Sequence, residues 1–100
     1  MPLPPDRDHR ISKADARAIA NRFRAANPKG EHGGFFHAKQ VLELLSQPGV
    51  AGLRYYHGRQ TDGSSAMILV AVDAEGADMS DGVVLEQHFP CPPWCAPDFP

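Results

Sequence analysis

The chain has 100 residues, of which 42% are hydrophobic and 22% are charged, a composition typical of one small globular domain. Its net charge is −2, but the first 30 residues carry seven Lys or Arg against three Asp. No stretch approaches the roughly 18 apolar residues of a membrane helix, and the first ten residues lack the apolar segment of a secretory signal. These features predict a cytoplasmic protein that binds no membrane.

The N-terminal third predicts an arm, a helix and a linker. Residues 1–10 are polar and rich in proline, so we expect a flexible arm, followed by a single domain over 11–100. Ser12 and Asp15 have the spacing of a capping box, and apolar residues follow at helical intervals. This pattern predicts a helix over about 12–26 with a basic face. No aromatic platform or named nucleic-acid-binding motif accompanies that face, so we expect no nucleic-acid partner.

The next segments change period from helical to extended. Residues 27–34 hold three glycines without the Lys-Ser/Thr of a phosphate loop, which favours a plain linker. Apolar residues at helical spacing predict a second helix over about 36–46, ended by the Gln-Pro-Gly segment 47–49.

Three strands are expected after residue 49. Residues 50–57 alternate in character, which places Arg54 and Tyr56 on one face of a strand and His57 on the other. Asp62-Gly63 predicts a hairpin turn, and the nearly continuous apolar run 66–72 predicts a central strand. An acidic turn over 73–82 separates it from a third strand over 83–89. The predicted fold is α+β, with two N-terminal helices packed on a three-stranded antiparallel sheet (α-α-β-β-β) and a proline-rich C-terminal tail.

That tail holds both cysteines of the chain. His88, Cys91 and Cys95 lie within eight residues, and thiolate and imidazole groups are the ligands that zinc prefers. A fourth ligand could come from His57, His37, His32 or His9. The same two cysteines could instead close a short disulfide, act as a redox pair, or pack as small apolar groups beside the prolines and Trp94.

Several segments together resemble a known group of proteins. They are the Leu-rich Gln-Pro-Gly-x-x-Gly-x-Arg-x-Tyr stretch over 44–58, the Val-Ala-Val-Asp segment within 69–79, and Cys-Pro-Pro-Trp-Cys over 91–95. This combination resembles a family of short uncharacterised bacterial proteins. The resemblance spans about residues 41–95 and implies no known activity.

No catalytic motif is recognisable, so we expect a protein that is not an enzyme. The sequence favours a small binding or self-assembly module, without a cofactor, that forms a homo-oligomer or binds a protein partner. Arg54, Tyr56 and Trp94 are the residues expected at its interface. The alternative is a zinc-binding or thiol-redox protein that uses His88, Cys91 and Cys95.

Overall fold

The protein is described by a computed structural model that covers residues 2–97 and 99. The chain divides into two compact units. One consists of Phe36–His88 with the first few residues of the chain, and the other of Asp6–Phe35 with the chain from Phe89 onward. We call them the sheet unit and the ribbon unit. The expected arm over 1–10 and single domain over 11–100 stay a prediction.

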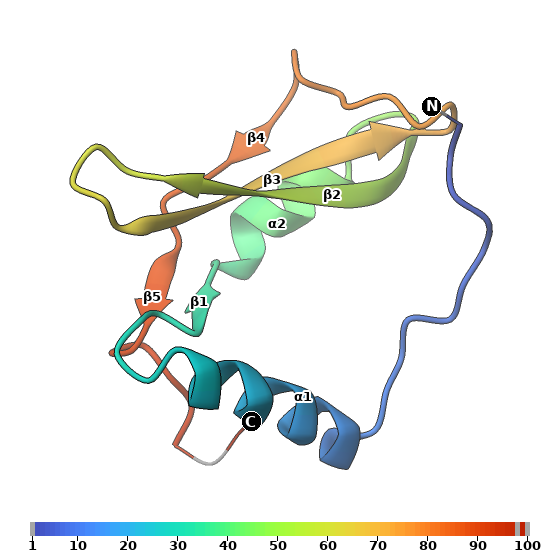
Figure 1. Ribbon diagram of the computed structural model, residues 1–100. Helices are drawn as coiled ribbons and strands as arrows, with labels where there is room; N and C mark the ends of the chain where they lie inside the picture. The colour runs from blue at the N-terminus through green and yellow to red at the C-terminus, as the bar shows by residue number, and fades with distance from the viewer. Residues whose placement is uncertain (1, 98, 100) are drawn as a thin grey trace. The chain divides into compact units, whose positions relative to one another are not determined.

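The sheet unit combines one helix with a three-stranded antiparallel sheet (Figure 1). Helix α2 (Ala38–Leu45) precedes the strands β2 (Val50–Arg59), β3 (Ser65–Asp73) and β4 (Val84–Leu85), which lie in the order β2-β3-β4. Asp62-Gly63 makes the predicted hairpin turn between β2 and β3, and Gly63 has a φ of +90°, which favours glycine. Leu44 of α2 is fully buried against Leu69 and Ala71 of β3.

The side chain of Gln47 links the end of α2 to the residue before β4 through two hydrogen bonds. Its Nε2 donates to the Leu44 carbonyl at 2.8 Å, and its Oε1 accepts from the Val83 amide at 2.9 Å. One side chain thus satisfies a carbonyl at the helix end and a backbone donor 36 residues further along the chain.

The ribbon unit contains a helix and a two-stranded sheet. Helix α1 (Lys13–Ala26) is capped by the Ser12 hydroxyl, which accepts from the Asp15 amide at 3.0 Å as the capping pattern predicts. Strand β1 (Gly33–Phe35) pairs antiparallel with β5 (Phe89–Cys91), and Gly33 lies opposite Cys91. No residue that the structure describes in this unit is buried.

The prediction of two helices and a three-stranded antiparallel sheet is confirmed. Helix α1 belongs to the ribbon unit and only α2 to the sheet unit, so the packing of both helices on this sheet stays a prediction. No helix in the described part of the chain has the length and apolar character needed to cross a membrane.

Two boundaries differ from those expected. The strand predicted over 83–89 is divided into β4 and β5, which belong to different sheets, because Gln87 between them has a φ of 61° that interrupts extended backbone. The linker predicted over 27–34 ends in strand β1, because its last residues find a partner strand near the C-terminus.

Candidate functional site

Strand β2 forms one edge of the sheet in its unit. It has ten residues, pairs with β3 alone, and contains no proline. The opposite edge is different, because β4 has two residues and the backbone of Asp78 and Met79 also covers β3 there. The register of β2 with β3 shifts between Val50 and Gly52 and is regular from Gly52 to Arg59. A long regular edge is the part of a sheet that can accept a further strand.

The hairpin hydrogen bonds show which backbone groups of β2 face outward. The Gln60 amide donates to the Ser64 carbonyl at 2.8 Å, and bonded pairs alternate along an antiparallel ladder. The even-numbered residues of β2 therefore bond to β3, and Leu53, Tyr55 and His57 direct their N–H and C=O groups to the free edge. Ala71, the partner of Leu53, bonds on its other side to Met79, as this alternation requires.

Apolar side chains accompany these outward backbone groups. Leu53 is 46% exposed and Tyr55 is 59% exposed, although their β3 partners Ala71 and Leu69 are buried. The Tyr55 ring meets the His57 ring edge-on, with centroids 5.6 Å apart. The α2 side of the sheet is thus covered over β3 but open along β2.

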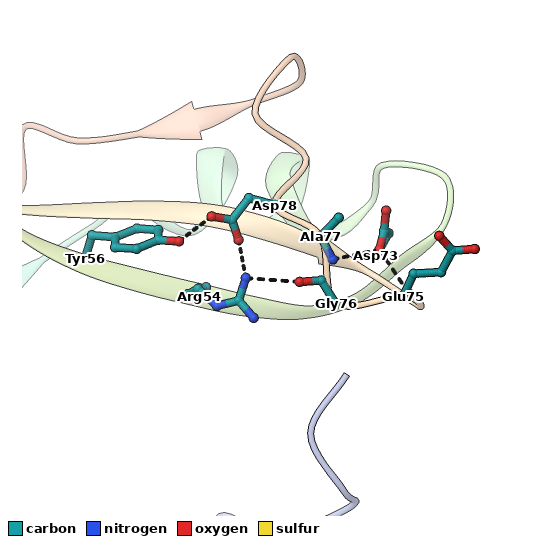
Figure 2. Close-up of polar contacts among 7 residues, drawn as sticks. All are labelled: Arg54, Tyr56, Asp73, Glu75, Gly76, Ala77 and Asp78. Atoms are coloured by element: carbon teal, nitrogen blue, oxygen red, sulfur yellow. Dashed lines mark hydrogen bonds and ion pairs between the residues drawn. The ribbon is translucent and has the colours of Figure 1, made fainter. Parts of the chain in front are cut away.

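The other face of the sheet carries a polar network, which Figure 2 shows. Arg54 and Tyr56 lie opposite Val70 and Ile68, and both side chains bind the carboxylate of Asp78. The Arg54 guanidinium also donates to the Gly76 carbonyl at 3.3 Å. Asp78 pairs with Val72 on the side of β3 that faces away from β2. The ion pair between Arg54 and Asp78 therefore spans β3.

This network shifts the pKa of all three groups. The hydrogen bond from Tyr56, followed by the hydrogen bond and charge of Arg54, lowers the pKa of Asp78, although burial opposes the shift. The bond to Asp78 is also the main reason that the pKa of Tyr56 is raised. The pKa of Arg54 is raised chiefly by its hydrogen bond to Asp78. The network gives the Arg54 guanidinium a carboxylate partner beside the apolar side chains of β3.

The tail of the chain forms a second candidate site, within the ribbon unit. Cys91 and Cys95 are joined in a disulfide, with Cα atoms 4.9 Å apart. The His32 Nδ1 lies 3.8 Å from the Cys91 Sγ, and Arg24 donates from Nε to the same nitrogen at 3.4 Å. Trp94 packs edge-on against Phe89 and is 62% exposed.

The residues expected at an interface and those expected to bind zinc are each divided between the two units. Arg54 and Tyr56 share one face, whereas Trp94 belongs to the other unit, so a common interface of all three stays a prediction. His57 and His88 belong to the sheet unit, where His88 lies near the Phe36 ring, and their place beside the two cysteines also stays a prediction.

Sequence reasoning missed Arg24 and Asp78, and it gave His32 only as one of four candidates for a fourth zinc ligand. His32 and Cys91 are 59 residues apart, and nothing in the spacing of either predicts the other. The one available signal was that His32 precedes two glycines, which allow a close approach of backbone.

No family model, curated protein or solved structure matches this chain.

Proposed function

We propose that this protein is a non-enzymatic self-assembly module in which strand β2 pairs with β2 of a second copy. The observation that carries the proposal is the ten-residue edge with outward N–H and C=O groups and exposed apolar side chains. Strand addition at such an edge satisfies backbone groups and buries side chains in one step.

The balance of buried and exposed apolar groups supports association. In the described residues, six hydrophobic residues are buried, whereas fourteen large hydrophobic residues are at least 38% exposed. Contiguous exposed apolar surface on a small soluble protein marks a contact surface. Leu53 and Tyr55 belong to this exposed set and lie directly on the edge.

The charges of β2 favour one register for the second copy. An antiparallel pair centred on Tyr55 places that residue opposite its own copy, because a twofold axis relates the two strands. Arg54 then lies opposite Tyr56 of the second copy, and Arg59 opposite Ala51, so no two arginines meet. This register also pairs Leu53 with His57, both of which have outward backbone groups, as hydrogen-bonded pairs require.

The ion pair between Arg54 and Asp78 also supports pairing of β2 with a second copy of the chain. The residues of β2 that carry a permanent charge are Arg54 and Arg59. Two strands that each carry these arginines would repel each other. Asp78 neutralises Arg54 within each chain. The positive charge near the centre of the paired strands is thereby removed before the copies meet.

The mass in solution tests the proposal. Sedimentation over a range of concentrations should give twice the chain mass at high concentration. Tyr55→Lys should weaken association at least about tenfold, because a charged side chain at the edge is desolvated on pairing. Val84→Lys is the matched control, since Val84 is 47% exposed on the opposite edge, and it should leave association unchanged. A wild-type chain that stays monomeric at every concentration overturns the proposal.

A cross-linking experiment tests the register. In a Cys91→Ser/Cys95→Ser background, Tyr55→Cys should form a disulfide-linked dimer, because Cα atoms of a bonded antiparallel pair lie about 5.5 Å apart, within disulfide range. Arg59→Cys is the control, because its two copies would be separated by roughly 27 Å at ~3.4 Å per residue. A dimer that cross-links through Arg59→Cys and not through Tyr55→Cys contradicts this register.

A further inference from the structure

The ribbon unit brings one imidazole to the two cysteines. The His32 amide donates to the Cys91 carbonyl at 2.9 Å, directly beside the pair of Gly33 with Cys91. His32 and Cys91 are therefore neighbours because of backbone hydrogen bonds. Both residues are half-buried, so their contact is shielded from bulk water on part of its surface.

A tight turn brings the second sulfur back to the first. The Trp94 amide donates to the Pro90 carbonyl at 2.9 Å, and the Cys95 amide to the Pro93 carbonyl at 3.0 Å. The ligand atoms of His32, Cys91 and Cys95 consequently lie within 4.8 Å of one another. Cys95 is exposed, so a reductant in solution can reach its sulfur.

We propose that reduction of the Cys91–Cys95 disulfide creates a zinc site whose ligands are His32, Cys91 and Cys95. Zinc–sulfur bonds of about 2.3 Å and zinc–nitrogen bonds of about 2.0 Å place the ligand atoms of a tetrahedral site roughly 3.5–3.8 Å apart. The distance of 3.8 Å from His32 Nδ1 to Cys91 Sγ already has this value. The two sulfurs must separate, which follows from breaking their bond. The Cys95 Sγ must also settle beside His32, since the three ligand atoms lie within 4.8 Å of one another.

The state of the imidazole fits a metal ligand. Arg24 donates to His32 Nδ1, so this nitrogen accepts a hydrogen bond and carries a lone pair rather than a proton. An imidazole nitrogen that carries a lone pair is the kind of atom that binds zinc. Zinc would take the place of the Arg24 donor at this nitrogen.

The chemistry has two balanced steps. A dithiol reductant gives two electrons and two protons to the disulfide, which becomes two thiols while the dithiol becomes a disulfide. Zn²⁺ then displaces both thiol protons to solvent and binds two thiolates and one imidazole. The cluster has three members among the residues that the structure describes, so water completes the tetrahedron. This site is independent of pairing through β2.

Zinc titration of untagged protein tests the site. Protein reduced with a phosphine and titrated anaerobically with Zn²⁺ alone should bind one ion per chain and release two protons, whereas oxidised protein should bind none. Cobalt in place of zinc should give thiolate-to-metal charge-transfer absorption and the strong visible bands of a tetrahedral site.

Variants identify the ligands. His32→Ala and Cys91→Ser should each weaken zinc binding by at least about tenfold. His88→Ala and His57→Ala are the matched controls and should leave the affinity unchanged. Circular dichroism of each reduced variant establishes that it is folded. Reduced, folded wild-type protein that binds no zinc overturns the proposal, as does a loss of binding caused by His88→Ala and not by His32→Ala.

Discussion

The sheet unit and the ribbon unit are each stabilised internally by different interactions. The sheet unit contains every buried hydrophobic residue that the structure describes, with Leu44 and Ala71 fully enclosed. The ribbon unit contains no buried residue in its described part, but it contains the disulfide and the backbone ladder between β1 and β5. A segment too small to enclose a core depends on cross-links or metals. Apolar packing thus stabilises the sheet unit, whereas a disulfide and backbone hydrogen bonds stabilise the ribbon unit.

Removing core packing should have the largest effect, confined to the sheet unit. Leu44→Ala deletes a fully buried side chain against Leu69 and Ala71, and should lower the free energy of unfolding by about 2–5 kcal/mol. Leu45→Ala is the matched control, because Leu45 is 42% exposed, and it should change stability by less than about 1 kcal/mol. Urea unfolding followed by circular dichroism measures both. Equal losses in the two variants would show that α2 is not anchored through Leu44.

Opening the disulfide should have a smaller effect, confined to the ribbon unit. Cys91→Ser/Cys95→Ser removes a cross-link with a sequence separation of four, and loop-closure entropy for so short a loop is worth about 2 kcal/mol. Hydrogen exchange should accelerate at the His32 amide, which bonds to Cys91, and remain slow at Leu69 in β3. Wild-type protein in reductant without zinc should behave as the variant does. Equal acceleration in β3 would contradict the division into two separately stabilised units.

The polar network should have the smallest effect, and one that depends on pH. Because the pKa of Asp78 is lowered, its contribution to stability is present above the ordinary carboxyl pKa of about 3.9 and lost as the pH falls through the lower folded value. Because the pKa of Tyr56 is raised, its contribution is present below about 10 and lost as the pH rises through the higher folded value. Tyr56→Phe should therefore be less stable than wild type at neutral pH.

The difference between wild type and Tyr56→Phe should shrink at both extremes of pH, as measured by urea unfolding across the acid and alkaline ranges. Tyr55→Phe is the control, since the hydrogen bond to Asp78 comes from Tyr56. A difference that is constant with pH would show that the Tyr56–Asp78 bond does not contribute to stability.

Local signals in the sequence predicted the elements whose cause is local. The Ser12 cap, the Asp62-Gly63 turn and the apolar run within β3 each depend on residues a few positions apart, and each is found where it was expected. Strand β1 was missed because Gly33 and Gly34 have little tendency to form strands by themselves, and their partners lie near the C-terminus.

The amino-acid sequence by itself determined two helices, a three-stranded sheet and the alternation that puts Arg54 and Tyr56 on one face, and it offered a disulfide as one of several states of the two cysteines. Only the tertiary structure decided that Asp78 binds Arg54 and Tyr56, and that His32 lies beside Cys91. Helix caps and strand alternation follow from the geometry of neighbouring residues. Contacts across 22, 24 and 59 residues follow from strand register, which spacing along the chain does not encode.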